Sequence, residues 1–255
     1  MTLIVADAVE LLGAVGGAAM VFADPPDNIG LQYDNGRSDA MDRGEYVRNL
    51  ATWLDLSAVT APVVWFSVNA IWQSAVWAWA SHTSADRDVR MIPWYFTFGQ
   101  HRHSDLGNNY RPIFRISVPG FVWNTDAIRI PSKRQQMGDK RADPRGRVPG
   151  DVWGGPADTP GLCRVQGNNR ERRSWHPTQH PEGIVERAIL MSTHPGDLVV
   201  DPFMGTGTTL RACLKTGRRC ITGDISETYV RKVSEETGEP VADVHAAAPL
   251  MENET

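Results

Sequence analysis

Uninterrupted apolar runs alternate along the first third of the chain with segments in which apolar residues recur every three or four positions. The apolar runs cover residues 2–5, 19–23 and 63–68. The segments with helical spacing cover residues 6–16, 44–58 and 70–81. An apolar run bounded by turn residues is typical of a buried strand, and the helical spacing is typical of an amphipathic helix. The alternation predicts an α/β fold with a largely parallel sheet.

The pattern changes in the middle of the chain and returns near its end. Residues 91–99 and 110–118 are predicted to be two strands late in the sheet, joined by a polar turn. Regular spacing then fades, until residues 180–226 again give helix, strand, glycine-rich turn, helix and strand. The predicted organisation is a folded unit in residues 1–122 and 174–236, an irregular insertion at 123–173 and a flexible tail at 237–255.

Composition narrows the class of protein. With 255 residues, 41% of them apolar, the chain can form one globular domain carrying an insertion. Cys163, Cys213 and Cys220 form no CxxC pair, which predicts reduced thiols in a cytoplasmic protein rather than a disulfide framework. The first residues have no basic region before an apolar stretch, so no secretion signal is expected. Polar residues interrupt the long apolar stretch 63–80, so no membrane span is expected.

Charge is unevenly distributed. The net charge of the chain is only −4, but the insertion 123–173 holds eleven Lys or Arg against six Asp or Glu, a local net of +5. The remainder therefore carries −9. An acidic body with one basic, Gly/Pro-rich insertion is the arrangement expected of a protein that contacts nucleic-acid phosphates through that insertion. An ordinary solvated surface loop is the alternative.

The segment DPFMGTGTT, residues 201–209, follows the last long apolar run. Gly205 and Gly207 allow a tight turn and a close backbone approach to a ligand, and Thr208 and Thr209 can cap the following helix. Asp224 ends the next predicted strand, where a carboxylate can accept hydrogen bonds from ribose hydroxyls. The order of these features predicts a nucleoside cofactor. Neither the GxGxxG motif nor a phosphate-loop lysine is present, which disfavours NAD and ATP.

A second chemical signal stands at the end of the strand 19–23, where Asp24, Pro25, Pro26 and Asp27 follow a buried apolar run. Two prolines fix the backbone and aim neighbouring hydrogen-bond acceptors in advance.

Four motifs together resemble the β-class of S-adenosylmethionine-dependent amino-DNA methyltransferases. They are Asp24-Pro25-Pro26 followed by Asn28, the basic insertion, Trp175-His176-Pro177-Thr178-Gln179-His180-Pro181, and the glycine turn 201–209. The resemblance covers nearly the whole chain and follows the family order. It implies a Rossmann-like, doubly wound, mostly parallel sheet in the permuted methyltransferase arrangement. Residues 1–122 would be its catalytic part, 123–173 its target-recognition insertion and 174–236 its cofactor-binding part.

The resemblance also implies a reaction. Asp24 and the backbone carbonyl of Pro25 or Pro26 would accept the two N–H bonds of an exocyclic base amino group while its nitrogen attacks the methyl group of S-adenosylmethionine. The base must first leave the duplex. An acidic first residue of the motif goes mostly with N6 of adenine in this family. The alternatives are N4 of cytosine, an unusual base, or a catalytically silent DNA-binding protein that retains the cofactor fold.

Asp27 departs from the family, which normally has an aromatic residue there that stacks on the extruded base. Loss of that stacking would cost about 1–3 kcal/mol. Three interpretations stay open. Tyr33, Trp65 or Phe98 could supply the stack, Asp27 could read a polar or modified base, or the protein could be inactive. If activity is retained, Asp27→Tyr should preserve or raise it, whereas Asp24→Ala should abolish it.

Site residues follow from the resemblance. The catalytic group is Asp24, Pro25, Pro26 and Asp27. The cofactor group is Asp7, Thr178, Asp201, Phe203, Gly205, Gly207, Thr208, Thr209 and Asp224, although Asp7 could simply cap a helix. For double-stranded DNA we predict Arg129, Lys133, Arg134, Arg147, Arg164, Asn168, Arg170 and Arg172. No metal is expected, because no His, Cys or carboxylate set has ligand spacing. Family members often dimerise, so a homodimer is one alternative for this chain.

Overall fold

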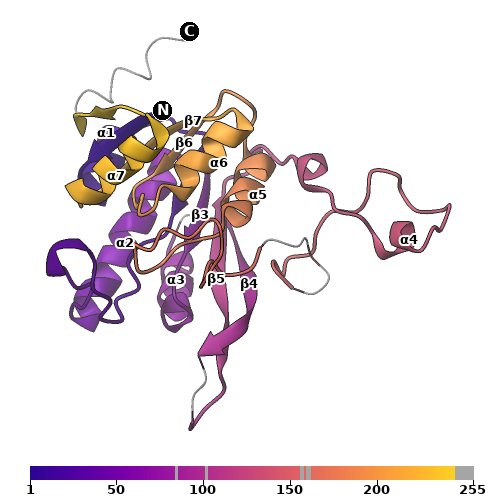
Figure 1. The fold of residues 1–255 in the computed structure, drawn as a ribbon, viewed down its shortest axis with the longest axis horizontal. Helices are drawn as coiled ribbons and strands as arrows, with labels where there is room; N and C mark the ends of the chain where they lie inside the picture. Colours follow the sequence, from indigo (N-terminus) through magenta and orange to yellow (C-terminus); the bar gives the residue numbers. More distant parts are fainter. Residues whose placement is uncertain (84–85, 101–102, 156–157, 159–161, 245–255) are drawn as a thin grey trace.

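The structure is a computed structural model that describes residues 1–83, 86–100, 103–155, 158 and 162–244. The described residues form one eight-stranded sheet in the order β4-β5-β3-β2-β6-β7-β1-β8 (Figure 1). The strands are β1 (Thr2–Val5), β2 (Met20–Ala23), β3 (Val63–Ser67), β4 (Asp88–Gln100), β5 (Asn108–Ser117), β6 (Leu198–Asp201), β7 (Arg219–Asp224) and β8 (Val241–Ala242). All pairs are parallel except β3 with β5 and β5 with β4. The α/β fold with a largely parallel sheet is thus confirmed.

The helices cover both faces of this sheet. They are α1 (Ala8–Ala14), α2 (Arg43–Thr60), α3 (Gln73–Ala80), α4 (Lys133–Gln136), α5 (Glu182–Ser192), α6 (Thr208–Thr216) and α7 (Glu227–Thr237), with short 3-10 turns at Asp34–Gly36, Ala70–Trp72 and Thr125–Ile128. The segment 70–81, predicted as one helix, therefore starts with a 3-10 turn.

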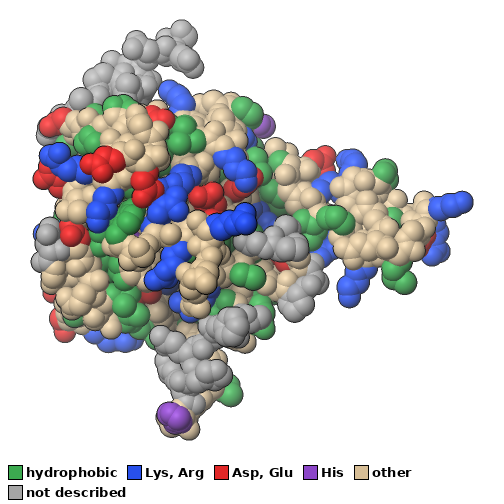
Figure 2. Space-filling view, in the orientation of Figure 1, with side chains coloured by type: hydrophobic (Ala, Val, Ile, Leu, Met, Phe, Trp, Pro, Cys, Tyr) green, Lys and Arg blue, Asp and Glu red, His purple; other side chains and the backbone are tan. Residues whose placement is uncertain are grey.

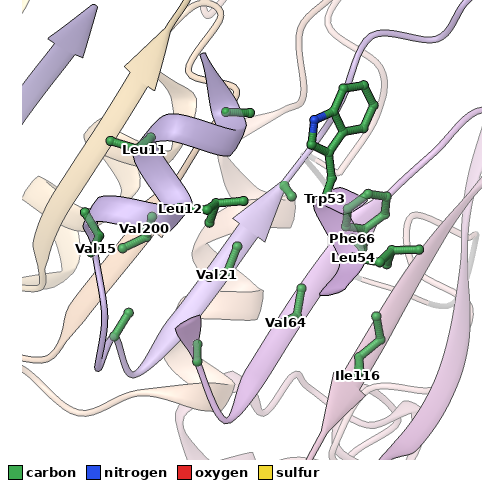
Figure 3. Close-up of a cluster of buried hydrophobic side chains, with 14 of the residues drawn as sticks. Leu11, Leu12, Val15, Val21, Trp53, Leu54, Val64, Phe66, Ile116 and Val200 are labelled. Carbon is green, nitrogen blue, oxygen red and sulfur yellow. The ribbon is translucent and has the colours of Figure 1, made fainter. Parts of the chain in front are cut away.

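Alternate residues of each central strand face opposite helical layers. Val21, Val64 and Val200 pack with residues of α1 and α2 (Figure 3). Their neighbours Phe22 and Val199 pack with residues of α5, α6 and α7. Because the central strands are buried on both faces, their sequences are continuously apolar rather than alternating.

β2 and β6 are neighbours in the sheet although about 180 residues separate them in sequence. From β2 the chain continues to β3 on one side, and from β6 it continues to β7 on the other. The direction of winding reverses between these two strands. In open α/β sheets, ligands bind beyond the carboxyl ends of the strands at such a reversal.

The insertion after β5 leaves the body as an arm that contains α4 (Figure 1). Its regular structure is sparse, in keeping with the loss of periodicity in its sequence. Arg129 forms ion pairs with Asp126 and Asp143, and Arg145 pairs with the same two carboxylates. Lys and Arg side chains stand at the outer end of the arm (Figure 2). Part of the positive charge of the arm therefore holds the arm together.

The end of the chain differs from the sequence prediction. Val241 and Ala242 form β8, which pairs in parallel with Leu3 and Ile4 of β1, so the region predicted as tail begins with an edge strand. Residues 245–255 lie outside the described part of the chain. Within the described residues, no helix is both long and apolar enough to cross a bilayer.

Candidate active site

A cavity of about 710 Å³ opens at the carboxyl ends of β2 and β6. Asp24, Pro25, Pro26 and Asp27 line one side of it. Of the residues predicted to hold the cofactor, Asp7, Thr178, Asp201, Phe203, Thr208, Thr209 and Asp224 line the same cavity. The carboxylate corner and the glycine turn, far apart in sequence, thus share one cleft. Its volume is within the range usual for small-molecule sites.

Asp24 lies at the end of β2 and is held from two sides. Arg111 on β5 donates from Nη2 to Asp24 Oδ1 at 2.5 Å. The His180 Nε2 atom lies 3.3 Å from Asp24 Oδ2. Burial alone would raise the pKa of Asp24, but the charge of Arg111 and the contact with His180 outweigh burial and hold it well below its usual range. The carboxyl is therefore ionised at neutral pH and can act as a hydrogen-bond acceptor.

Asp27 binds the same arginine. Arg111 Nη1 donates to Asp27 Oδ1 at 2.8 Å and to Oδ2 at 3.1 Å. The Asn69 side chain approaches Oδ2 at 3.4 Å, and Trp72 Nε1 donates to the Asp27 carbonyl at 2.7 Å. The Asp27 side chain is buried. The residue that replaces the family aromatic is thus paired with a cation, and both its side chain and its backbone carbonyl accept hydrogen bonds.

Arg111 uses its whole guanidinium fork. In addition to the two aspartates, its Nε donates to Ser67 Oγ at 2.7 Å. Ser67 Oγ also lies 2.9 Å from His180 Nε2. Burial would lower the pKa of Arg111, but Asp24 and Asp27 together raise it above its usual value. The guanidinium is therefore a fixed positive charge between two carboxylates.

The two prolines differ in their hydrogen bonding. Tyr46 of α2 donates its hydroxyl to the Pro26 carbonyl at 2.6 Å. Tyr46 is fully buried and its pKa is raised above the usual value by burial, so the hydroxyl stays a donor. The Pro26 carbonyl is thus already engaged by the protein.

The glycine turn is shaped by backbone conformation and packing. Gly205 and Gly207 have φ angles of 49° and 76°, which favour glycine. A Cβ on Gly207 would lie 2.7 Å from Cγ1 of Val233, so this glycine allows α6 to approach α7. The cavity is lined instead by their neighbours, among them Met204 and Thr206. Gly207 itself is the N-cap of α6, so the prediction that Thr208 and Thr209 cap this helix is wrong, because they occupy its first turn.

Asp224 closes the turn from β7. Its carboxylate accepts hydrogen bonds from the backbone N–H of Gly205 at 3.0 Å and of Ser226 at 2.8 Å. Burial raises its pKa. Asp224 therefore fixes the glycine turn and also lines the cavity.

Asp201 at the end of β6 is buried, and burial raises its pKa to about 7. Its Oδ1 accepts a hydrogen bond from the Phe203 backbone at 2.9 Å. Phe203 lines the cavity and contacts Trp53 edge to face at a centroid distance of 5.1 Å. This end of the cavity combines an apolar wall with a carboxyl group, as a nucleoside with a charged side chain requires.

The loop that contains Asp34 is hydrogen-bonded to residues of the second half of the chain at the edge of the cavity that Asp34 lines. Ser226 donates its hydroxyl to Asp34 Oδ2 at 2.9 Å, and Tyr229 accepts from the Asp34 backbone N–H at 2.8 Å. The Tyr33 ring lies 5.5 Å from the ring of His176. We call this connection the Asp34 latch.

Asp7 and His176 both make contacts that hold the local backbone. Asp7 caps α1 by accepting a hydrogen bond from Val9 N at 2.8 Å, and it also lines the cavity. His176 Nδ1 is within hydrogen-bonding distance of the Thr178 backbone, so the ring orients its loop. Among the described residues, no three His, Cys, Asp or Glu side chains gather as a metal site would.

The residues predicted to contact DNA fall into three groups. Arg164 and Arg172 line the cavity itself. A second groove, of about 1050 Å³ and located between the arm and α5, is lined by Arg129, Lys133, Arg134 and Arg147. Asn168 and Arg170 are exposed and line neither of these two cavities.

Among the aromatic candidates for base stacking, Tyr33 lines the cavity. Trp65 is fully buried and donates from Nε1 to Ser192 Oγ at 2.9 Å, so it is not available for stacking. The side chain of Phe98 lies outside the described residues. Sequence reasoning missed Phe96, which lines the cavity with the Arg164 guanidinium 4.8 Å from its ring centroid.

The sequence-based prediction of the site also missed Tyr110 and Arg111, which both line the cavity. They belong to β5, which was predicted only as a strand. The one signal for Arg111 in the sequence is the unpaired negative charge at Asp27, which calls for a buried cation.

Comparison with known proteins gives a consistent result. The family model described as DNA methylase matches residues 18–236. The Type II methyltransferase M.BglII of Bacillus subtilis is 29% identical over 187 residues, which are 64% of this chain and 50% of that protein. The DNA adenine methyltransferase YhdJ of Escherichia coli K12 is 32% identical over 152 residues, which are 56% of this chain and 49% of that protein. The matched stretches thus span about half the length of these relatives.

The fold agrees with that of solved structures. The TTHA0409 protein of Thermus thermophilus, solved with S-adenosyl-L-methionine, superposes with a TM-score of 0.61 at 18% identity, covering 95% of this chain and 97% of that one. At this identity the likeness concerns the fold alone. The family match runs from before the Asp24 corner to beyond Asp224, and therefore through both sides of the cavity, so the chain belongs to the N6/N4 DNA methylase family.

Proposed function

We propose that the protein transfers a methyl group from S-adenosylmethionine to an exocyclic amino group of a DNA base that has left the duplex, with N6 of adenine as the preferred acceptor. The observation that carries the proposal is the shared cavity, in which Asp24 faces the glycine turn of the cofactor half. The preference for adenine rests on the acidic residue at the start of the motif and on a relative named as a DNA adenine methyltransferase.

S-adenosylmethionine fits the polar groups of the second half. We assign Asp224 to the ribose hydroxyls, Phe203 to the adenine ring and Asp201 to the positively charged end of the methionine part, because all three line the cavity. A cation beside Asp201 would favour loss of its proton, which offsets the effect of burial. The sulfonium methyl group would then point toward Asp24.

Asp24 and one proline carbonyl accept the two N–H bonds of the target amino group. Because the Tyr46 hydroxyl already binds the Pro26 carbonyl, we assign the second acceptor to Pro25. These acceptors draw the nitrogen lone pair out of conjugation with the ring as the nitrogen attacks the methyl group. The sulfur–methyl bond breaks as the nitrogen–methyl bond forms, S-adenosylhomocysteine leaves, and the nitrogen gives up one proton by way of its acceptors to water. The acceptors are fixed before the base arrives, which lowers the entropic cost of reaching the reactive geometry.

Stacking on the extruded base is assigned to Phe96 with Arg164, and to Tyr33 on the cofactor side. All three line the cavity, and Arg164 is already stacked on the Phe96 ring. DNA phosphates are assigned to Lys133 and Arg134 of the arm, whereas Arg129 is engaged by Asp126 and Asp143 and supports the arm.

One observation favours a second candidate, a cofactor-binding protein without transfer activity. Both oxygens of Asp24 already have partners, Arg111 and His180. Mass spectrometry of nucleosides from DNA incubated with protein and S-adenosylmethionine separates the candidates. N6-methyladenine that disappears in Asp24→Ala supports the proposal, N4-methylcytosine changes the acceptor, and unmodified DNA together with measurable cofactor binding supports the silent protein.

A further inference from the structure

Two carboxylates and one hydroxyl meet at one guanidinium fork beside the catalytic corner. Arg111 reaches Asp24 with one terminal nitrogen and Asp27 with the other, and its Nε reaches Ser67. Only 16% of the Arg111 side chain is exposed and 10% of that of Asp27. Opposite charges buried at this separation each favour the ionised form of the other. Removing one partner leaves the other charge buried without a counter-charge, which destabilises the fold.

The charges of this group do not cancel. Two carboxylates share one guanidinium, so the Asp24–Arg111–Asp27 group carries one net negative charge. If Asp27 were neutral, Arg111 and Asp24 would form a closed pair without net charge, and Asp24 would be a poorer acceptor for the target amino group. If Arg111 were neutral, two neighbouring carboxylates would repel each other and one would take up a proton.

We propose that Asp27 and Arg111 act together as a positioning pair for Asp24, in which Asp27 draws the guanidinium to one side so that Arg111 orients the catalytic carboxylate without neutralising it. The inference rests on the proposed methyl transfer. Asp27 then does not read the base, because both of its oxygens face Arg111 and one also faces Asn69. Asp27→Tyr should then lower activity rather than preserve or raise it, because the pair would lose its second carboxylate.

Other titratable groups also surround Asp24. His180 approaches from the loop before α5. Among the described residues, the charge of Asp24 also acts on Tyr33, Tyr46, His176 and Asp201. His180 also contacts Ser67, which binds Arg111 Nε, so a variant of Arg111 removes a neighbour of this contact, whereas Asp27→Asn does not touch it.

The test is a double-mutant cycle on the intact protein with Arg111→Gln, Asp27→Asn and the combined variant, measuring kcat, the Kd of S-adenosylmethionine and the pH dependence of kcat. Each single variant should lower kcat about 10²-fold with little change in cofactor Kd, because the acceptor is misplaced or neutralised. In Arg111→Gln the acidic limb of the pH profile should move up by about one pH unit or more, and in Asp27→Asn it should not.

The combined variant should lose no more activity than the less active of the two single variants. It removes both the repulsion between Asp24 and Asp27 and the neutral pair between Asp24 and Arg111. Arg111→Lys retains the charge but cannot form the three-way fork, so its acidic limb should stay low while kcat falls. The matched control is Arg115→Gln. Arg115 lies on the same strand and pairs with Asp88 away from the cavity, so its loss should alter stability and leave kcat and the pH profile unchanged.

Independent losses that multiply in the combined variant, or an unmoved acidic limb in Arg111→Gln, would overturn the positioning pair while leaving methyl transfer intact. Wild-type protein that binds cofactor and yields no methylated nucleoside would overturn the proposed function and this inference with it. The wild-type measurement therefore distinguishes the two failures.

Discussion

The buried carboxyl of Asp201 should make the protein without cofactor less stable as pH rises through neutrality. Burial raises the pKa of Asp201 from 3.8 to about 7. Between these pH values the folded protein keeps a proton that the unfolded chain releases. The contribution of Asp201 to the free energy of unfolding is therefore fully present below the unfolded pKa and falls as pH rises to the folded pKa. A difference of about 3 pKa units corresponds to about 4 kcal/mol in total, of which about 2.5 kcal/mol is lost between pH 5 and pH 8.

The variant Asp201→Asn should remove this dependence. The amide oxygen can still accept the Phe203 N–H hydrogen bond, but the side chain has no proton to lose. Urea denaturation at pH 5 and pH 8, without cofactor, should show that the free energy of unfolding of the variant relative to wild type rises by about 2.5 kcal/mol between these pH values. The variant Asp86→Asn, which removes an exposed acidic group, controls for the change in net charge. Equal pH slopes in Asp201→Asn and wild type would refute the reasoning.

Three further predictions concern other parts of the molecule. Gly207→Ala should destabilise the protein by about 1–3 kcal/mol in thermal unfolding, because the φ of Gly207 is positive and a Cβ there would collide with Val233. The control Gly217→Ala has a similar φ but open space around the Cβ, so it should cost less. Equal losses in the two variants would contradict the packing role of Gly207. Neutralising Lys133 and Arg134 together should flatten the dependence of log K on log salt by about 2, and an unchanged slope would exclude the arm as the phosphate contact. Asp34→Ala should raise the KM for S-adenosylmethionine with little loss of kcat, and a selective loss of kcat would contradict the latch.

Most of the sheet could be predicted because its central strands are buried on both faces and read as apolar runs. The same holds for the two ends of the site, since Asp24 directly follows β2 and Asp224 is the last residue of β7. These features depend on residues that are close together in the sequence, and local physical rules are sufficient to locate them.

Arg111 could not be predicted in this way. It reaches Asp24 across 87 positions, and only the antiparallel pairing of β5 with β3, with Ser67 opposite Ile113, brings it to the corner. An arginine in a polar stretch of strand gives no sign of which face it will occupy until the register is known. For the same reason the arm arginines were assigned to DNA, although Arg129 is bound by neighbouring aspartates.

The position of β1 between β7 and β8 has a consequence for biosynthesis. Residues 2–5 are made more than two hundred residues before the strands that flank them. During that interval the newly made chain carries an apolar strand with both edges open, a state that is prone to aggregation. Slowing translation just before the codons of β7 should therefore reduce the yield of folded protein more than slowing it just before the codons of β1.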